Sequence, residues 1–99
     1  MILVREVFQL KFGKAKEAKA AWKEASVIFK KHNLPPTRVL VDLAGKYYTF
    51  ILETIHPDLA TFEVSLKNEL AMKEFGEWYM SKFVPLVESG RREIFTIVE

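Results

Sequence analysis

The segment 14–32 is amphipathic with a helical period, and this feature constrains the fold more than any other. Its apolar residues recur every three or four positions, at Ala15, Ala18, Ala21, Trp22, Ala25, Ile28 and Phe29. Such spacing predicts a helix with one buried face. Asn33 accepts the left-handed conformation that ends a helix, and Pro35 and Pro36 cannot continue one. Because strand-like runs flank this helix on both sides, we expect it to cover a sheet.

Four segments alternate apolar and polar residues as strands do. They are residues 2–10, 37–44, 47–55 and 92–98. Gly45 and Lys46 predict a tight hairpin turn between the second and third strands. A short helix to about Leu66 and a longer one over about 67–83 are expected before the last strand. The order β-α-β-β-α-β predicts an α+β fold, the ferredoxin-like split βαβ sandwich, as a single domain over residues 1–99.

The predicted sheet has one dry face and one mixed face. The dry face, which we assign to the helices, carries Val39, Val41, Leu43, Tyr48, Phe50 and Leu52. The mixed face has an apolar set, Leu3, Val7, Leu40, Ile51, Phe95 and Ile97. Its polar residues are Arg5, Gln9, Asp42 and Glu53. Two helices cannot cover both faces, and a large apolar patch in water is unfavourable. We therefore expect a homodimer through the mixed faces.

Two short motifs resemble those of a known family. Residues 8–14, FQLKFGK, together with Glu17 form a strand-to-helix transition, and residues 77–79 and 85–90 precede the last strand as EWY and PLVESG. These motifs are similar to those of the dimeric α+β barrels, most closely the NIPSNAP-like branch, which is related to antibiotic biosynthesis monooxygenase-like domains. The resemblance implies a dimeric α+β barrel. Because such proteins include oxygenases, isomerases and proteins without assigned activity, it fixes no function.

The chain departs from the family pattern at two places. Members of the branch usually carry Glu and Arg two strand positions apart, where this chain has Val4 and Glu6. We therefore expect no site built on these two positions. Heme-degrading relatives place a ligating histidine on the second long helix, and residues 67–84 contain no histidine. Neither heme nor another cofactor is expected.

The candidate ligand-binding residues are Arg5, Tyr48, Glu53 and Trp78. Gly76 leaves space beside Trp78, so that we expect this indole to line a cavity, whereas Trp22 is expected in the core. Arg5 forms either part of a polar patch in the cavity or a structural ion pair with Asp42 or Glu53. A cavity of at least about 300 Å³ lined by Trp78 and strand residues would favour ligand binding.

Metal and nucleic-acid binding are not expected. His32 falls at the last turn of the first helix as a cap, and His56 precedes a proline as a turn residue. Neither has the spacing of a metal site, and the chain has no cysteine. The net charge is only +2. The basic stripe of the first helix indicates a solvated face, and it consists of Lys16, Lys19, Lys23 and Lys30.

The remaining composition bears on location. No apolar run approaches the roughly 20 residues of a membrane span, so we expect no membrane association and a cytoplasmic protein. The side-chain amides are few beside many Lys and Glu residues, which fits a thermophilic source. They are Gln9, Asn33 and Asn68.

These observations favour a NIPSNAP-like homodimer without assigned chemistry. We expect any ligand to be a small, largely apolar organic molecule held between helices and sheet. One alternative is a cofactor-free monooxygenase or isomerase of the antibiotic biosynthesis monooxygenase type, with Tyr48, Trp78 and a polar strand residue holding the substrate. Another is a protein-interaction module without a pocket.

Overall fold

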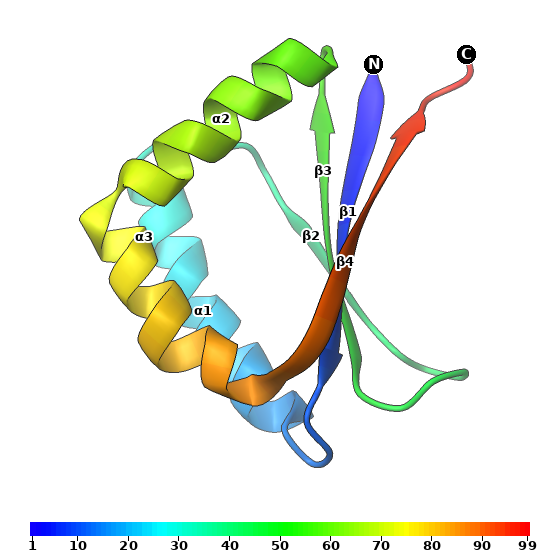
Figure 1. Cartoon of the computed structure of the whole chain (residues 1–99), viewed down its shortest axis with the longest axis vertical. Coiled ribbons are helices and arrows are strands. Elements are labelled where there is room, and N and C mark those ends of the chain that lie inside the picture. The colour runs from blue at the N-terminus through cyan, green and yellow to red at the C-terminus, as the bar shows by residue number, and fades with distance from the viewer.

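A computed structural model describes residues 1–99 as an antiparallel sheet with helices on one face (Figure 1). The strands are β1 (Ile2–Leu10), β2 (Arg38–Val41), β3 (Thr49–His56) and β4 (Val87–Thr96). Their spatial order is β2-β3-β1-β4, and every neighbouring pair is antiparallel. This topology confirms the predicted α+β, ferredoxin-like fold.

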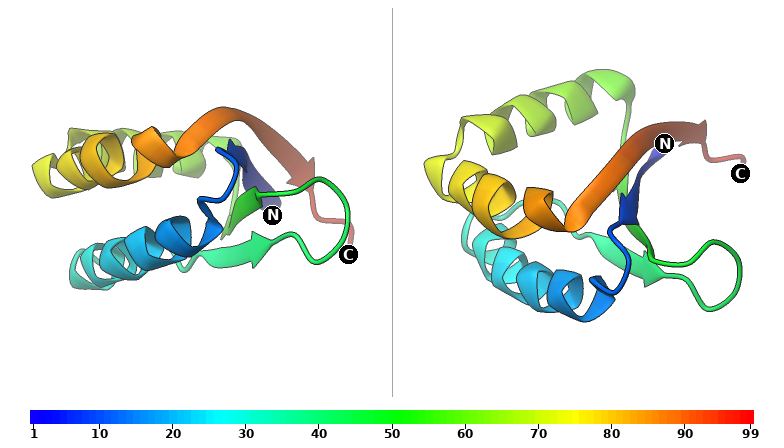
Figure 2. Two further views of the ribbon diagram at one scale, coloured as in Figure 1. Left: turned by 90° about the horizontal axis from the view of Figure 1, so that it is seen from below. Right: turned by 60° about the horizontal axis from the view of Figure 1, so that its bottom comes forward.

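The helical layer consists of α1 (Ala15–Lys31), α2 (Leu59–Ala71) and α3 (Lys73–Trp78). A π-helical turn (Tyr79–Phe83) and a 3₁₀ turn (Val84–Leu86) connect α3 to β4. Figure 2 shows α1 and the α2–α3 segment as two arms on the same side of the sheet. The opposite, outer face of the sheet carries no helix.

Helix α1 forms where its period predicts. Its buried residues are Ala18, Ala21, Ala25 and Ile28. Gly13, with φ of 82°, turns the chain from β1 into the helix, and Asn33, with φ of 53°, follows its end. His32 is the C-cap residue, as expected. The local sequence therefore determines both the position and the buried face of this helix.

The predicted boundary between the later helices near Leu66 was wrong. The break lies at Met72, whose φ and ψ of −76° and 120° are extended rather than helical. Asp58 caps α2, because its Oδ1 accepts a hydrogen bond of 2.8 Å from the Thr61 N–H. The extended residue changes the direction of the chain, and α3 packs against α1. Tertiary packing, rather than local periodicity, decides this break.

The hairpin between β2 and β3 is longer than predicted. The strands end at Val41 and resume at Thr49, so that the tight turn expected at Gly45 and Lys46 is a loop over 42–48. Side chains brace the loop, because Asp42 Oδ1 accepts from the Thr49 N–H at 3.1 Å. Its apolar residue Leu43 is fully exposed. Leu43 therefore does not belong to the dry face, and Val41, also exposed, contributes little to it.

Strand β4 begins earlier than the predicted residues 92–98. It pairs with β1 from Val87 onward, and its Gly90 lies opposite Phe8. A Cβ atom at Gly90 would meet the Phe8 ring at 3.0 Å. Glycine therefore lets the ring lie against the strand, and residues 89–90 are part of the sheet.

The core lies between the inner face of the sheet, α1 and the segment around α3. Trp78 is only 6% exposed, and its Nε1–H donates a 2.8 Å hydrogen bond to the Ala21 carbonyl. Trp22 is half-buried. The expectation that Trp22 is the core tryptophan was wrong, because the small residues of α1 make room for the indole of Trp78 instead. That indole needs a buried acceptor, which the α1 backbone supplies.

Candidate functional site

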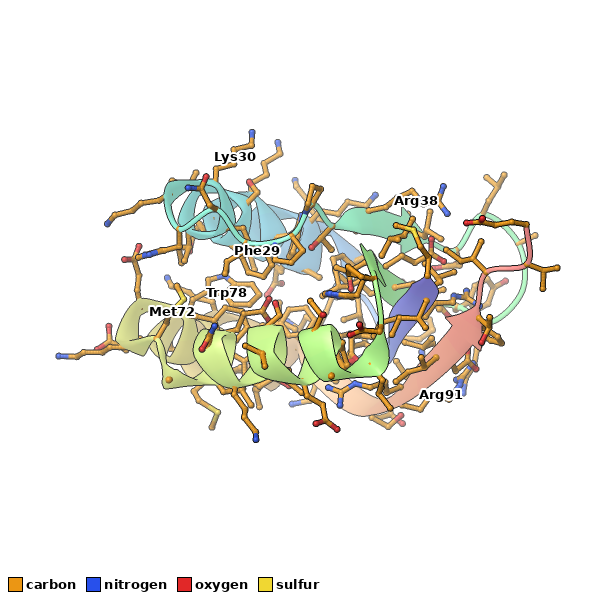
Figure 3. The ribbon with its side chains drawn as sticks, turned by 90° about the horizontal axis from the view of Figure 1, so that it is seen from above. Phe29, Lys30, Arg38, Met72, Trp78 and Arg91 are labelled. Carbon is orange, nitrogen blue, oxygen red and sulfur yellow. The ribbon has the colours of Figure 1, made fainter.

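A cavity of about 140 Å³ lies between the helices and the inner face of the sheet. Figure 3 shows Phe29 and Trp78 in the layer between α1 and the α2–α3 segment, and both line this cavity. Further aromatic rings of Phe, Tyr and Trp in the lining are Phe8, Trp22, Phe62, Phe75, Tyr79 and Phe83. The lining includes Trp78 and strand residues, as expected. The volume is below the 300 Å³ set out above and close to that of engineered cavities of about 150 Å³ that accept benzene.

An ion pair lies in the lining of this cavity. Glu6 on β1 and Arg92 on β4 are directly opposite in the sheet register. The Arg92 Nε–H donates to Oε1 of Glu6. The guanidinium carbon of Arg92 also lies 5.3 Å from the centroid of the Phe62 ring, within reach of a cation–π contact. The single arginine in the lining is thus already paired.

Glu69, on α2, is a second carboxylate in the lining. Its pKa is raised from 4.5 to about 7, mainly by burial and also by the nearby charge of Glu6, while Arg92 acts in the opposite direction. The Glu69 side chain forms neither a hydrogen bond nor an ion pair. Near neutral pH the carboxyl group is therefore divided between its protonated and ionised forms.

His56 also faces the cavity, and the prediction that it is a turn residue was wrong. It ends β3 with 4% of its surface exposed. Its Nε2 lies 2.9 Å from Thr54 Oγ1, and its ring makes an edge contact with Phe62 at 5.1 Å. Burial lowers the pKa of His56 below its usual 6.5, so the imidazole is neutral at pH 7. It adds no charge to the cavity.

Two of the sequence-predicted site residues lie on the outer face, away from this cavity. Arg5 Nε lies 3.0 Å from Glu53 Oε2, outside hydrogen-bond geometry. Arg38 donates to Glu53 Oε1 from Nε at 3.0 Å and from Nη2 at 2.5 Å. The expected pair of Arg5 with Glu53 is therefore present, whereas Asp42 braces the hairpin loop.

The four predicted residues do not form one site. Trp78 lines the cavity, whereas Arg5 and Glu53 share the opposite face of the sheet. Tyr48 lies in the hairpin loop with φ of 59°, and its ring contacts Phe12 at 4.7 Å. Sequence reasoning missed the polar residues that do line the cavity, which are Glu6, His56, Glu69 and Arg92. The alternation of β1 and β3 offered a partial signal for the first two, because they share the inner face.

Two further properties of the structure concern metals and membranes. No group of three or more His, Cys, Asp or Glu side chains is arranged to hold a metal ion. None of the helices has both the length and the apolar character needed to cross a bilayer.

Comparisons with known proteins describe the fold. No protein-family model and no curated protein sequence matches the chain. An uncharacterized NIPSNAP-like domain protein from Burkholderia xenovorans superposes with a TM-score of 0.89 at 16% identity, over 98% of this chain and 84% of that chain. A NIPSNAP family protein from Agrobacterium tumefaciens gives 0.87 at 14% identity, over 99% and 86%.

A third structure is more distant. SnoaB, a cofactor-independent oxygenase from Streptomyces nogalater, gives a TM-score of 0.67 at 15% identity, over 99% of this chain and 93% of that chain. Identities this low show the fold alone. The NIPSNAP-like fold implied by the sequence motifs is thereby confirmed.

Proposed function

We propose that this chain is a homodimer that binds a small, largely apolar organic molecule in the cavity between its helices and its sheet. The observation that carries the proposal is the cavity itself, which combines aromatic walls with a few polar side chains. Ligand sites in proteins typically combine apolar walls with a few polar groups that fix orientation. At about 140 Å³, the cavity suits a single six-membered ring.

The outer face of the sheet supports the proposed dimer. Ile55 and Phe95 are exposed there, and Leu3, Leu40 and Ile51 are only half-buried. The charged residues among them are already paired with one another, so a second copy could cover the face without burying an unpaired charge. In this proposal, residues 1–99 form one domain in each copy. We place the dimer in the cytoplasm.

A binding measurement tests the ligand proposal. Trp22 and Trp78 both line the cavity, so intrinsic fluorescence reports its occupancy. Titration with benzyl alcohol is expected to change the emission saturably. Ser65→Phe places a ring in the cavity lining and should abolish the response. Val64→Phe, the matched control on the exposed side of α2, should leave it intact. A purely linear response up to millimolar benzyl alcohol, identical in all three proteins, would contradict the proposal and favour an interaction module.

Sedimentation tests the dimer independently. The protein is expected at twice the 11.5 kDa of one chain at micromolar concentration. Phe95→Asp should shift it to the monomer, because it places a charge in the proposed interface. Val98→Asp, beyond the end of β4 and almost fully exposed, is the control and should remain dimeric. A folded monomer of the unaltered protein would refute the dimer.

A second candidate function is proton transfer, as in a cofactor-free oxygenase or isomerase. The observation that favours it is Glu69, whose pKa of about 7 is suited to a general base at neutral pH. An enzyme of this kind would lose turnover in Glu69→Gln while retaining ligand binding.

A further inference from the structure

The charges in the cavity lining do not balance. Glu6 and Glu69 are acidic, and Arg92 is the one basic residue that is charged at neutral pH. Arg92 forms its ion pair with Glu6 and offsets the charge of Glu69 only in part, so that the Glu69 carboxylate has no ion pair of its own. Two other titratable side chains line the cavity, His56 on β3 and Tyr79 on the π-helical turn. The imidazole is neutral at pH 7, and a phenol carries no positive charge, so neither can balance Glu69.

The walls around this carboxylate also favour a cation. Aromatic rings carry negative charge on their faces and attract ammonium groups, most strongly when the pair is desolvated. Phe62, Phe75, Trp78 and Tyr79 all contribute rings to the lining. An anionic ligand would instead lie near two carboxylates and an arginine that is already paired. A neutral ligand would leave the charge imbalance uncorrected.

We infer that the cavity binds an organic ammonium compound, a single apolar or aromatic ring bearing a primary amine, whose charge pairs with Glu69. This inference rests on the proposed ligand-binding function and names the ligand class. When Glu69 is protonated before binding, the exchange balances: the carboxylic acid loses its proton to the buffer, and the ligand ammonium remains charged beside the carboxylate. The raised pKa of Glu69 supports this exchange, because it reflects a negative charge that burial leaves uncompensated.

Three probes with the same ring test the inference: benzylamine, benzyl alcohol and benzoate. Amines of this kind are protonated at pH 7. Calorimetric titration at pH 7 is expected to give an affinity for benzylammonium about tenfold above that for benzyl alcohol, and weaker binding of benzoate. Repeating the benzylamine titration in buffers of different ionisation enthalpy should reveal proton release.

Variants assign the effect to one carboxylate. Glu69→Gln is expected to lower the affinity for benzylammonium about tenfold and to leave that for benzyl alcohol within about twofold. Glu63→Gln removes an exposed carboxylate from the same helix and should change neither affinity. In the unaltered protein, the affinity for benzylammonium should rise between pH 6 and pH 8, whereas that for benzyl alcohol stays flat.

Each failure has a distinct meaning. If benzyl alcohol binds and benzylammonium binds no more tightly, the inference is overturned while the proposed function stands. If Glu69→Gln retains the preference for the ammonium probe, the partner is not Glu69 and the inference is again wrong. If none of the probes binds, the proposed function fails together with it. Should Glu69→Gln not fold, the pH dependence of the unaltered protein decides the matter.

Discussion

The two faces of the sheet each carry a cluster of glutamates and arginines, and the clusters differ in balance. On the outer face, Glu53 contacts both Arg5 and Arg38, and Glu93 contacts Arg5 and Arg91. Each carboxylate there has at least one arginine of its own. On the inner face, Arg92 pairs with Glu6, and Glu69 forms no ion pair.

From this difference we infer a structural role for the outer cluster and a functional one for the inner cluster. Paired charges at a sheet surface need nothing further, and such networks are found throughout proteins for structural reasons. An unpaired carboxylate in an aromatic-lined cavity is unfavourable for folding alone, since burial penalises its charged form. Residue types alone do not distinguish the two clusters. Their partners and their burial do.

The largest effect is expected from the aromatic wall of the inner side. Trp78→Ala should lower the free energy of unfolding by about 3–5 kcal/mol, since it opens a cavity and removes the hydrogen bond from the indole to the Ala21 carbonyl. Trp22→Ala should cost about 1–3 kcal/mol, because Trp22 is only half-buried. Urea melts at one protein concentration measure both. A larger loss for Trp22→Ala would restore it as the core tryptophan.

The next largest loss of stability is expected in the cluster on the outer face. Glu53→Gln should cost about 2–3 kcal/mol, because it leaves Arg5, whose side chain is 29% exposed, without its nearest carboxylate. The loss stays below that of a fully buried pair because Arg38 remains solvated. Chemical denaturation checks this, with Glu88→Gln on β4 as the exposed control. A change under about 0.5 kcal/mol, the usual scatter of surface substitutions, would show that the network contributes nothing.

A smaller effect on the free energy of unfolding, which depends on pH, is expected from Glu69 on the inner side of the sheet. The pKa of Glu69 is raised from 4.5 to about 7, so the folded state holds this proton more tightly than the unfolded state. Its stabilising contribution is therefore fully present below pH 4.5 and is lost as pH rises through 7. After allowance for partial solvent exposure, we expect a loss of about 1 kcal/mol.

Glu69→Gln should remove this decline, so that the variant is more stable than the unaltered protein at pH 8. Denaturant melts from pH 4 to pH 8 measure the difference, with Glu63→Gln as the control on the same helix. Parallel pH profiles for Glu69→Gln and the unaltered protein would place the titration elsewhere.

The smallest loss of stability is expected from a substitution of Arg38. Its side chain is 72% exposed, so Arg38→Ala should cost less than about 1 kcal/mol despite two hydrogen bonds to Glu53. Thermal melts of Arg38→Ala beside Glu53→Gln compare the two partners. If both cost the same, the solvated arginine carries more of the outer network than its exposure indicates.

Much of the fold follows from local patterns in the sequence. The apolar period of α1, the alternation of β1 and the order of elements predict the ferredoxin-like sandwich, because each pattern states which side of its element is buried. The ion pair of Arg5 with Glu53 was also accessible, since both residues alternate onto one face. The boundaries of the helices and strands were harder to predict from the sequence. The break at Met72 and the loop over 42–48 go with contacts to distant segments, because α3 packs against α1 and the Gln9 amide donates to the Tyr47 carbonyl.

The candidate site was decided by the tertiary structure. Glu6, Glu69 and Arg92 come from two strands and a helix that are far apart in the chain. The sheet register sets Glu6 opposite Arg92, and the packing of α2 over the sheet brings Glu69 to the same cavity. A local period specifies which face a side chain occupies, but not which distant side chain shares it. The charge imbalance is a property of that convergence, because it depends on how many partners each carboxylate meets once the chain has folded.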